Sequence, residues 1–321
     1  MKSTTKTLLI IAIVFVFGGL LLAGLGHAMG GSTKFTYAFE DGKLNFTKDS
    51  NNFVSDTVTV SKFDKLVVNS QIVDIDISDS GTDYQVSYHL PERFVPEISS
   101  GDTLSIMVPG GDDHFHVNLF TFDDYENARI TISIPRSDSD LVFDLESSTG
   151  EITIENVSFN GKLKTSTGDI SISDSDLGNL EIITSNGDAE YKKITCPEMK
   201  TTASTGESHF DNCEIGTLTG KTQTGDIHIK NSRVKSFNVE GSTSDIELKN
   251  VRTDDVNINV STGECELEID GSPEDYSCHL VSSTGDIEFG DAEHEKEFTY
   301  NGGSKNINIR TSTGDITVDF D

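Results

Sequence analysis

The sequence predicts an all-β protein, a single-chain β-solenoid (β-helix) of about nine 19-residue rungs behind one N-terminal transmembrane helix. Three observations predict it. A Ser-Thr-Gly-acid-Ile element recurs through the C-terminal half, apolar residues alternate with polar ones inside each repeat, and one long uncharged stretch lies near the N-terminus. Alternation of this kind is typical of strands, and a repeat that cannot bury its apolar residues alone has to stack on its neighbours.

The uncharged stretch runs from Leu8 to Gly26, which is close to the roughly 20 residues that a membrane-spanning helix needs. Lys2 and Lys6 precede it, and the first acid after it is Glu40. The positive-inside rule therefore places the N-terminus in the cytoplasm and the remainder outside the cell.

We accordingly expect a cytoplasmic tail over residues 1–7, a transmembrane anchor over 8–28 and a stalk or linker over 29–52. The expected location is the cell membrane, with a single span and an extracytoplasmic C-terminal part. A cleaved secretory signal is the alternative, because residues 26–28 (Gly-His-Ala) offer small side chains at a plausible cleavage site.

The charge balance excludes one class of partner. The chain has 54 Asp and Glu against 24 Lys and Arg, for a formal net charge of -30. Such a surface repels phosphate backbones, so we expect no nucleic-acid partner. The expected partners are the membrane, through the N-terminal helix, and an unidentified protein or glycan of the envelope or cell surface.

The repeat is defined by its glycine position, whose usual spacing is 19 residues over 147–321. That position holds Gly150, Gly168, Gly187, Gly206, Gly225, Ser244, Gly263, Gly285 and Gly314, each followed by an acid. Apolar residues recur two and four places later, and again near seven and nine and near twelve and fourteen, which predicts three short strands per coil.

Two corners of the coil have an expected backbone role. A glycine tolerates a positive φ, and the neighbouring hydroxyls can satisfy turn amides. Asparagine recurs six places after the glycine position, at Asn156, Asn212, Asn231 and Asn250, and tolerates the left-handed region better than most residues.

Residues 53–146 are strand-rich but lack the period. Residues 71–75 resemble a degenerate first rung, and the run Ala128–Pro135 leads into the first full repeat without a linker. We expect irregular opening coils of the same solenoid with hairpin excursions, rather than a separate domain. A further excursion is expected over residues 291–305, inside the longest interval.

The run Ile130–Pro135, followed by serial Ser-Thr-Gly-Asp-Ile turns behind an N-terminal anchor, resembles the bacterial putative-adhesin family of β-strand-repeat, toastrack-type extracytoplasmic proteins. The resemblance covers roughly residues 60–321 and implies a protein that is not an enzyme, with no catalytic residues. We expect no cofactor other than a possible divalent cation. The function expected from the resemblance is an adhesion or interaction surface at the cell envelope. The alternatives are a component that senses or signals envelope stress and, in a different class, a carbohydrate-active β-helix enzyme.

One outward column contains a candidate metal site. Three residues after the glycine position, stacking places His209 directly beneath His228, with Glu190 and Glu247 immediately outside them. Glu207 and Asp226 lie two residues away on the same face. Two imidazoles with nearby carboxylates are a plausible ligand set for Zn²⁺ or a similar divalent ion, and the alternative is an ordinary polar ladder.

The remaining candidates are weaker. The column of acids after the glycines could bind Ca²⁺ or could be a solvated face, and one acid per 19 residues favours the solvated face. Cys196 and Cys213 could form a disulfide between neighbouring rungs, although buried free thiols are the default. A cluster at Asp112, Asp113, His114 and His116 could bind a metal or be a solvated loop.

Overall fold

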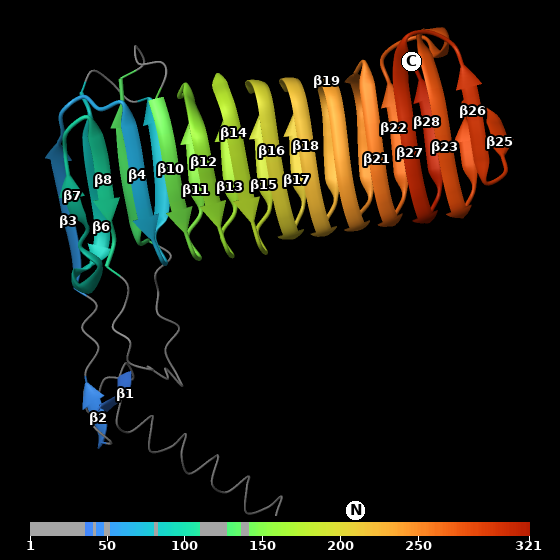
Figure 1. The fold of residues 1–321 in the computed structure, drawn as a ribbon. Helices are drawn as coiled ribbons and strands as arrows, with labels where there is room; N and C mark the ends of the chain where they lie inside the picture. The colour runs from blue at the N-terminus through green and yellow to red at the C-terminus, as the bar shows by residue number, and fades with distance from the viewer. Residues whose placement is uncertain (1–35, 41–42, 48–51, 80–82, 110–126, 136–140) are drawn as a thin grey trace, which may run out of the picture. The chain divides into compact units, whose positions relative to one another are not determined.

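The computed structural model describes residues 36–40, 43–47, 52–79, 83–109, 127–135 and 141–321 (Figure 1). The chain divides into two compact units, residues 1–52 with 111–126 and residues 53–110 with 127–321. In the first unit, β1 (Thr36–Glu40) pairs antiparallel with β2 (Lys43–Thr47). No helix within the described ranges is long and apolar enough to cross a membrane, and the anchor expected over 8–28 lies outside those ranges.

The second unit consists of strands stacked in two ladders, which confirms the all-β prediction (Figure 1). Ladder A holds the strands that follow the glycine corner and, at its two ends, antiparallel strands that pair with them. In spatial order they are β3 (Phe53–Thr59), β6 (Gln85–Pro91), β9 (Arg129–Ile134), β5 (Asp74–Asp79), β11 (Ile152–Glu155), β13 (Ile170–Ser173), β15 (Ala189–Lys192), β17 (Ser208–Asp211), the first part of β19 (Ile227–Thr243), β20 (Ile246–Arg252), β22 (Cys265–Ile269), β28 (Ile316–Phe320), β24 (Ile287–Phe289) and β25 (Ala292–His294).

Ladder B holds the strands that complete each coil. In spatial order they are β7 (Glu97–Ser99), β8 (Thr103–Met107), β4 (Lys65–Ser70), β10 (Leu141–Ser147), β12 (Phe159–Thr165), β14 (Leu177–Thr184), β16 (Thr195–Thr205), β18 (Glu214–Thr224), the second part of β19, β21 (Asp255–Thr262), β27 (Lys305–Thr313), β23 (Tyr276–Thr284) and β26 (Glu297–Asn301). The short 3-10 helices η1 (Glu92–Phe94) and η2 (Pro273–Asp275) connect strands.

Each regular coil therefore contributes one segment to each ladder, and the prediction of three strands was wrong. In the coil of β19 the two segments run on as a single strand. In β16 the expected second and third strands run on as one, with Cys196 and Met199 both buried and two exposed residues between them. The chain bends there without a turn residue, since the positive-φ positions on either side of this bend are the corners at Lys193 and Gly206. In β12, by contrast, Gly161 has a positive φ (133°) at the corresponding place.

The order of the coils differs from the order of the sequence at both ends. The coil of β4 and β5 lies between that of β8 and β9 and that of β10 and β11. At the other end, β27 and β28 insert between β21 and β22 on one side and β23 and β24 on the other (Figure 1). The degenerate first rung is therefore the direct neighbour of the first full repeat, whereas the strand of the run Ala128–Pro135 lies one coil further out.

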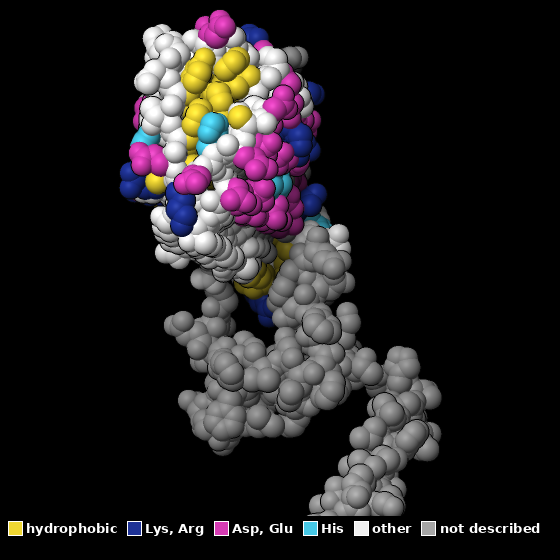
Figure 2. Space-filling view, turned by 90° about the vertical axis from the view of Figure 1, so that its right-hand side faces the viewer, with side chains coloured by type: hydrophobic (Ala, Val, Ile, Leu, Met, Phe, Trp, Pro, Cys, Tyr) yellow, Lys and Arg dark blue, Asp and Glu magenta, His cyan; other side chains and the backbone are white. Residues whose placement is uncertain are grey.

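Antiparallel strands close both ends of the unit. β25 and β26, from the excursion expected over 291–305, pair antiparallel with β24 and β23. At this end Phe289 is only half-buried and its ring packs against Phe298 and Tyr300, with centroids 5.0 and 5.2 Å apart. Apolar side chains are accordingly visible at this end in Figure 2.

The core lies between the two ladders and is built from the predicted inward columns. Ile152, Ile170, Ile227 and Ile246 share one column and are at most 4% exposed. Parallel pairing in register places each on its equivalent in the next coil, for example Ile152 on Ile170. This continuous burial is what a single repeat could not achieve alone.

The glycine corners are tight because successive coils approach closely. A β-carbon at any repeat glycine would lie 1.8 to 2.4 Å from the carbonyl oxygen of the equivalent residue in the neighbouring coil. A left-handed φ, which the sequence suggested as the reason for glycine, occurs only at Gly206, Gly263, Gly285 and Gly314 (φ 122–155°). The asparagine corner is as predicted. The φ values there are 50–58° at Asn156, Asn212, Asn231 and Asn250, and Asp174 and Lys193 share that conformation.

Candidate functional site

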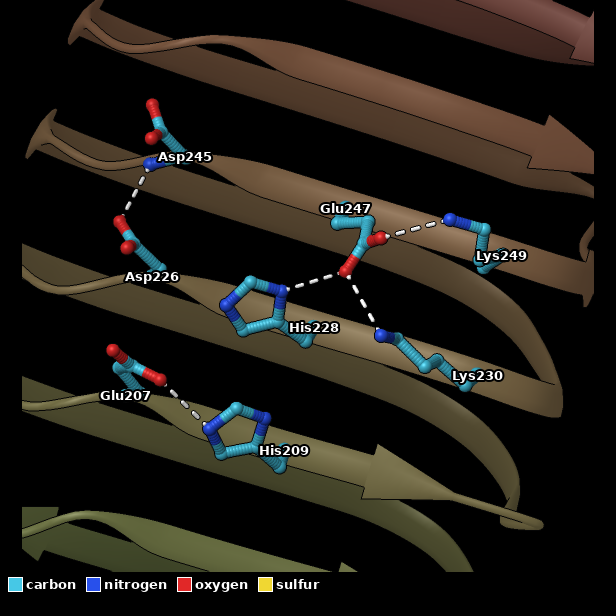
Figure 3. A network of polar contacts seen from close by, with 8 residues as sticks. All are labelled: Glu207, His209, Asp226, His228, Lys230, Asp245, Glu247 and Lys249. Atoms are coloured by element: carbon cyan, nitrogen blue, oxygen red, sulfur yellow. Dashed lines mark hydrogen bonds and ion pairs between the residues drawn. The ribbon is translucent and has the colours of Figure 1, made fainter.

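The two histidines predicted to stack do so on the outer face of ladder A. His209 of β17 and His228 of β19 are register partners, and their rings are 4.9 Å apart between centroids at an angle of 7° (Figure 3). Alternation along the strands explains the outward placement, since the flanking Phe210 and Ile227 are buried. The strand spacing thus fixes the separation of the two imidazoles.

Glu207 completes the cluster. Its Oε2 lies 2.9 Å from His209 Nε2, and one donor atom from each of Glu207, His209 and His228 lies within 4.8 Å of the other two. Glu207 is exposed and both histidines are partly exposed. The cluster therefore presents two imidazoles and a carboxylate to solvent.

The two carboxylates predicted as direct neighbours have other partners. Glu190 pairs with Lys192 at 2.5 Å, so its carboxylate is engaged by a lysine of its own strand. Glu247 accepts from His228 Nδ1 at 2.8 Å and pairs with Lys230 and Lys249 at 3.2 Å each (Figure 3). Neither belongs to the group whose donor atoms converge, because lysines hold both.

The environment of Glu247 keeps it ionised. Its side chain is 21% exposed, and this burial raises its pKa. Hydrogen bonds from His228, Lys249 and Lys230 outweigh the burial and lower the pKa of Glu247 to about 2. Glu247 is thus a fixed negative charge that orients the imidazole of His228.

The aspartates that follow the glycine positions have a structural role that sequence reasoning missed. Asp245 accepts the backbone N–H of Glu264 through Oδ1 at 2.8 Å, and Asp226 accepts that of Asp245 at the same distance. The same bond links each aspartate of this column that has a following coil to the next acid along: Asp74 to Glu151, Asp169 to Asp188, Asp188 to Glu207 and Asp315 to Asp286. The preference for aspartate over glutamate in this column was the sequence signal for this bond.

The three glutamates of the column behave differently. Across the described coils, Glu151, Glu207 and Glu264 accept no such amide from the next coil. Glu151 instead accepts a hydrogen bond from the Thr153 hydroxyl at 3.3 Å, and Glu207 turns to His209. In the sequence, glutamate in place of aspartate suggests only that the position tolerates either acid. In the structure, glutamate marks the coils whose carboxylate does not bind the backbone of the next coil.

The outer face of ladder B carries an open groove that the sequence analysis did not single out. Its volume is about 410 Å³, and side chains from β18, β19, β21, β27 and β23 line it. Along one side runs a hydrogen-bonded ladder in which Asn257 donates to Asn238 and Asn308 donates to Asn257, each at 3.1 Å. Along the other side are Lys221 and Glu240, which pair at 2.9 Å, followed by Asn259 and Arg310.

The cysteines do not pair. All four are free and buried, and Cys196 stands opposite Ile215, so Cys213 is displaced by two residues along the neighbouring strand. That displacement and one strand spacing separate the Cα atoms by about 8 Å, too far for a disulfide. Burial raises the thiol pKa of Cys196 to about 12 and that of Cys213 to about 11. The cluster of residues 112–116 lies outside the described residues.

A family model described as Toastrack DUF4097 matches residues 63–319. Among solved structures, the chain is similar to a putative adhesin from Bacteroides fragilis NCTC 9343, with 13% identity, 84% of this chain and 98% of that chain covered, and a TM-score of 0.47. It is also similar to a putative lipid-binding protein from Parabacteroides distasonis ATCC 8503, with 13% identity, 83% and 97% coverage, and a TM-score of 0.50. No curated protein matches the chain.

Proposed function

The chain belongs to the Toastrack DUF4097 family, and on that premise we propose that it serves as a non-catalytic adhesion or interaction surface at the cell envelope. In this proposal residues 8–28 anchor the chain in the cell membrane and the ladders lie outside the cell. The uncharged stretch behind Lys2 and Lys6 supports the orientation.

The observation that carries the proposal is the groove on ladder B. Five neighbouring strands line it, so its backbone is a rigid hydrogen-bonded frame, and hydrogen bonds between the asparagines order one row of side chains before a ligand binds. One row of amide side chains and one row of mainly charged side chains run along the groove, and each row repeats at strand spacing, which suits an extended polar chain such as a glycan or peptide. Its open form favours binding of a long ligand over enclosure of a small substrate.

The proposal is tested with intact cells that produce the full chain and with cells that lack it. We expect the producing cells to be retained several-fold better on surfaces coated with purified peptidoglycan or with cells of the same strain. Protease added to the intact cells should remove the ladders and abolish the difference. Equal retention, with the chain demonstrably at the surface, would contradict the proposed function.

A matched pair of variants tests the groove itself. Asn259→Trp fills the groove from β21, whereas Asn69→Trp places the same side chain in the same outward column on β4. Both positions are exposed, so both variants should fold. If cells with Asn259→Trp lose retention and cells with Asn69→Trp keep it, the groove mediates adhesion. If the two variants are retained equally, the groove is excluded as the adhesive surface.

A further inference from the structure

We propose that the outer face of ladder A holds a divalent transition-metal site, with Glu207, His209 and His228 as ligands and Zn²⁺ as the fitting ion. The three donor atoms already lie within 4.8 Å of one another. Imidazole nitrogens with a carboxylate oxygen are ligands that Zn²⁺ takes, whereas Ca²⁺ and Mg²⁺ are bound by oxygen alone. The two histidines therefore distinguish this cluster from the acidic column around it.

The backbone supplies the preorganisation. Register pairing holds His209 against His228, with nearly parallel rings at strand spacing. Tetrahedral coordination with bonds of about 2.0–2.2 Å requires donor atoms roughly 3.3 Å apart. Because the side chains of His209 and Glu207 are 44% and 49% exposed, rotation of these side chains can close the remaining distance without moving the strands.

The contacts around His228 are those expected of a ligating histidine. Its Nδ1 is engaged by Glu247, so Nε2 is left for a ligand, and the ring turns that nitrogen toward the side on which Glu207 meets His209 (Figure 3). A carboxylate on the second ring nitrogen orients a metal-bound histidine and raises its basicity. Lys230 and Lys249 hold Glu247 in place, which makes Glu247 a positioning residue.

Glu207 is free for this role because it accepts no backbone amide from the next coil, unlike the aspartates on either side of it. Three protein ligands leave a fourth position open, as in sites where zinc binds water or an external donor. The site lies on a different ladder from the groove. The proposed metal binding therefore does not depend on whether the groove mediates adhesion.

The test is calorimetric titration of the full chain, in detergent micelles, with Zn²⁺. We expect one ion per chain with a Kd in the micromolar range or tighter, undisturbed by millimolar Ca²⁺ or Mg²⁺. His209→Ala, His228→Ala and Glu207→Gln should each weaken binding about tenfold or more, equivalent to about 1.4 kcal/mol. Glu247→Ala should weaken it by about tenfold and alter the visible spectrum of bound Co²⁺, which a purely structural change elsewhere would not do.

Two controls are matched in residue type. His279→Ala removes a histidine on ladder B that faces Thr299, and Glu264→Gln removes a carboxylate of the same column that has no histidine beside it. Both should bind Zn²⁺ like the unaltered chain, and the variants at Glu207, His209, His228, Glu264 and His279 should unfold at nearly the same temperature in EDTA. Several weak ions per chain, equal in every variant and displaced by Ca²⁺, would overturn the proposal in favour of diffuse attraction to the acidic face.

Discussion

At the scale of single residues, the close approach of neighbouring coils decides which residue the glycine corner can hold. A fixed period makes every coil a copy of its neighbour, so the repeat glycines stack on one another across that gap. The spacing in the sequence could place these glycines, but the reason for them lies in the gap between coils, which no single repeat contains. Gly150 is required because a β-carbon there would lie 2.0 Å from the carbonyl oxygen of Val73, a residue 77 positions earlier in the sequence. The third member of the histidine cluster also depends on neighbouring residues. Lysines hold Glu190 and Glu247, so the carboxylate that joins the two histidines is that of Glu207.

Ser244 is the exception in the glycine column, and it leads to a prediction. Its buried Oγ has no hydrogen-bond partner among the residues that the structure describes. It occupies space next to Gly241, where the register neighbours are Thr222 and Val260. A β-carbon at Gly241 would lie 2.9 Å from that Oγ. We expect Gly241→Thr alone to destabilise the fold by roughly 1–3 kcal/mol through crowding.

The double variant Gly241→Thr/Ser244→Gly restores the arrangement of the preceding coil, in which Thr222 donates to Gly225 O at 3.2 Å. It removes a buried unpaired hydroxyl, so we expect it to be at least as stable as the unaltered chain, with a coupling of about 1–3 kcal/mol between the sites. Denaturant unfolding of the two single variants and the double variant measures this. Strictly additive effects would show that the two positions do not share one space.

At the scale of the element, the aspartate column couples one strand to the next. A carboxylate that accepts a backbone N–H stabilises more than a neutral acceptor does, and here the bond joins coils 19 residues apart. Alternation of apolar residues predicted the strands themselves but not this link, because an acid at an outward position is equally typical of a solvated face. The missing third strand has a similar cause: two consecutive outward residues resemble a turn in the sequence and form only a bend in the structure.

Asp245 and Glu264 allow a direct comparison, since they are adjacent in the column and both exposed. Asp245→Ala leaves the amide of Glu264 without its acceptor, and we expect a loss of about 1 kcal/mol of unfolding free energy. Glu264→Ala removes no such bond and should change stability by no more than about 0.5 kcal/mol. Chemical denaturation at neutral pH compares the two, and equal losses would mean that the column stabilises through charge alone.

At the scale of the whole ladder unit, the sequence predicted stacked coils but not their order. Coil surfaces are alike, so the chain can build an end, close it with antiparallel strands and then return to insert its last coil one place inward. The antiparallel closures cover strand edges that would otherwise pair with other chains. Only contacts between coils reveal this route, since β27 has β21 on one side and β23 on the other although it lies close to the C-terminus in sequence.

This insertion predicts that the C-terminus is among the best-protected parts of the unit. Amides in Lys305–Thr313 should exchange with deuterium as slowly as those in Asp255–Thr262, because both strands lie between two parallel partners. Amides in Glu297–Asn301 precede them in sequence but pair on one side only, with β23, and should exchange faster. Mass spectrometry of exchanged peptides ranks the three segments directly. Fraying of Lys305–Thr313 ahead of Glu297–Asn301 would indicate coils stacked in sequence order, with the last coil at the end of the ladder.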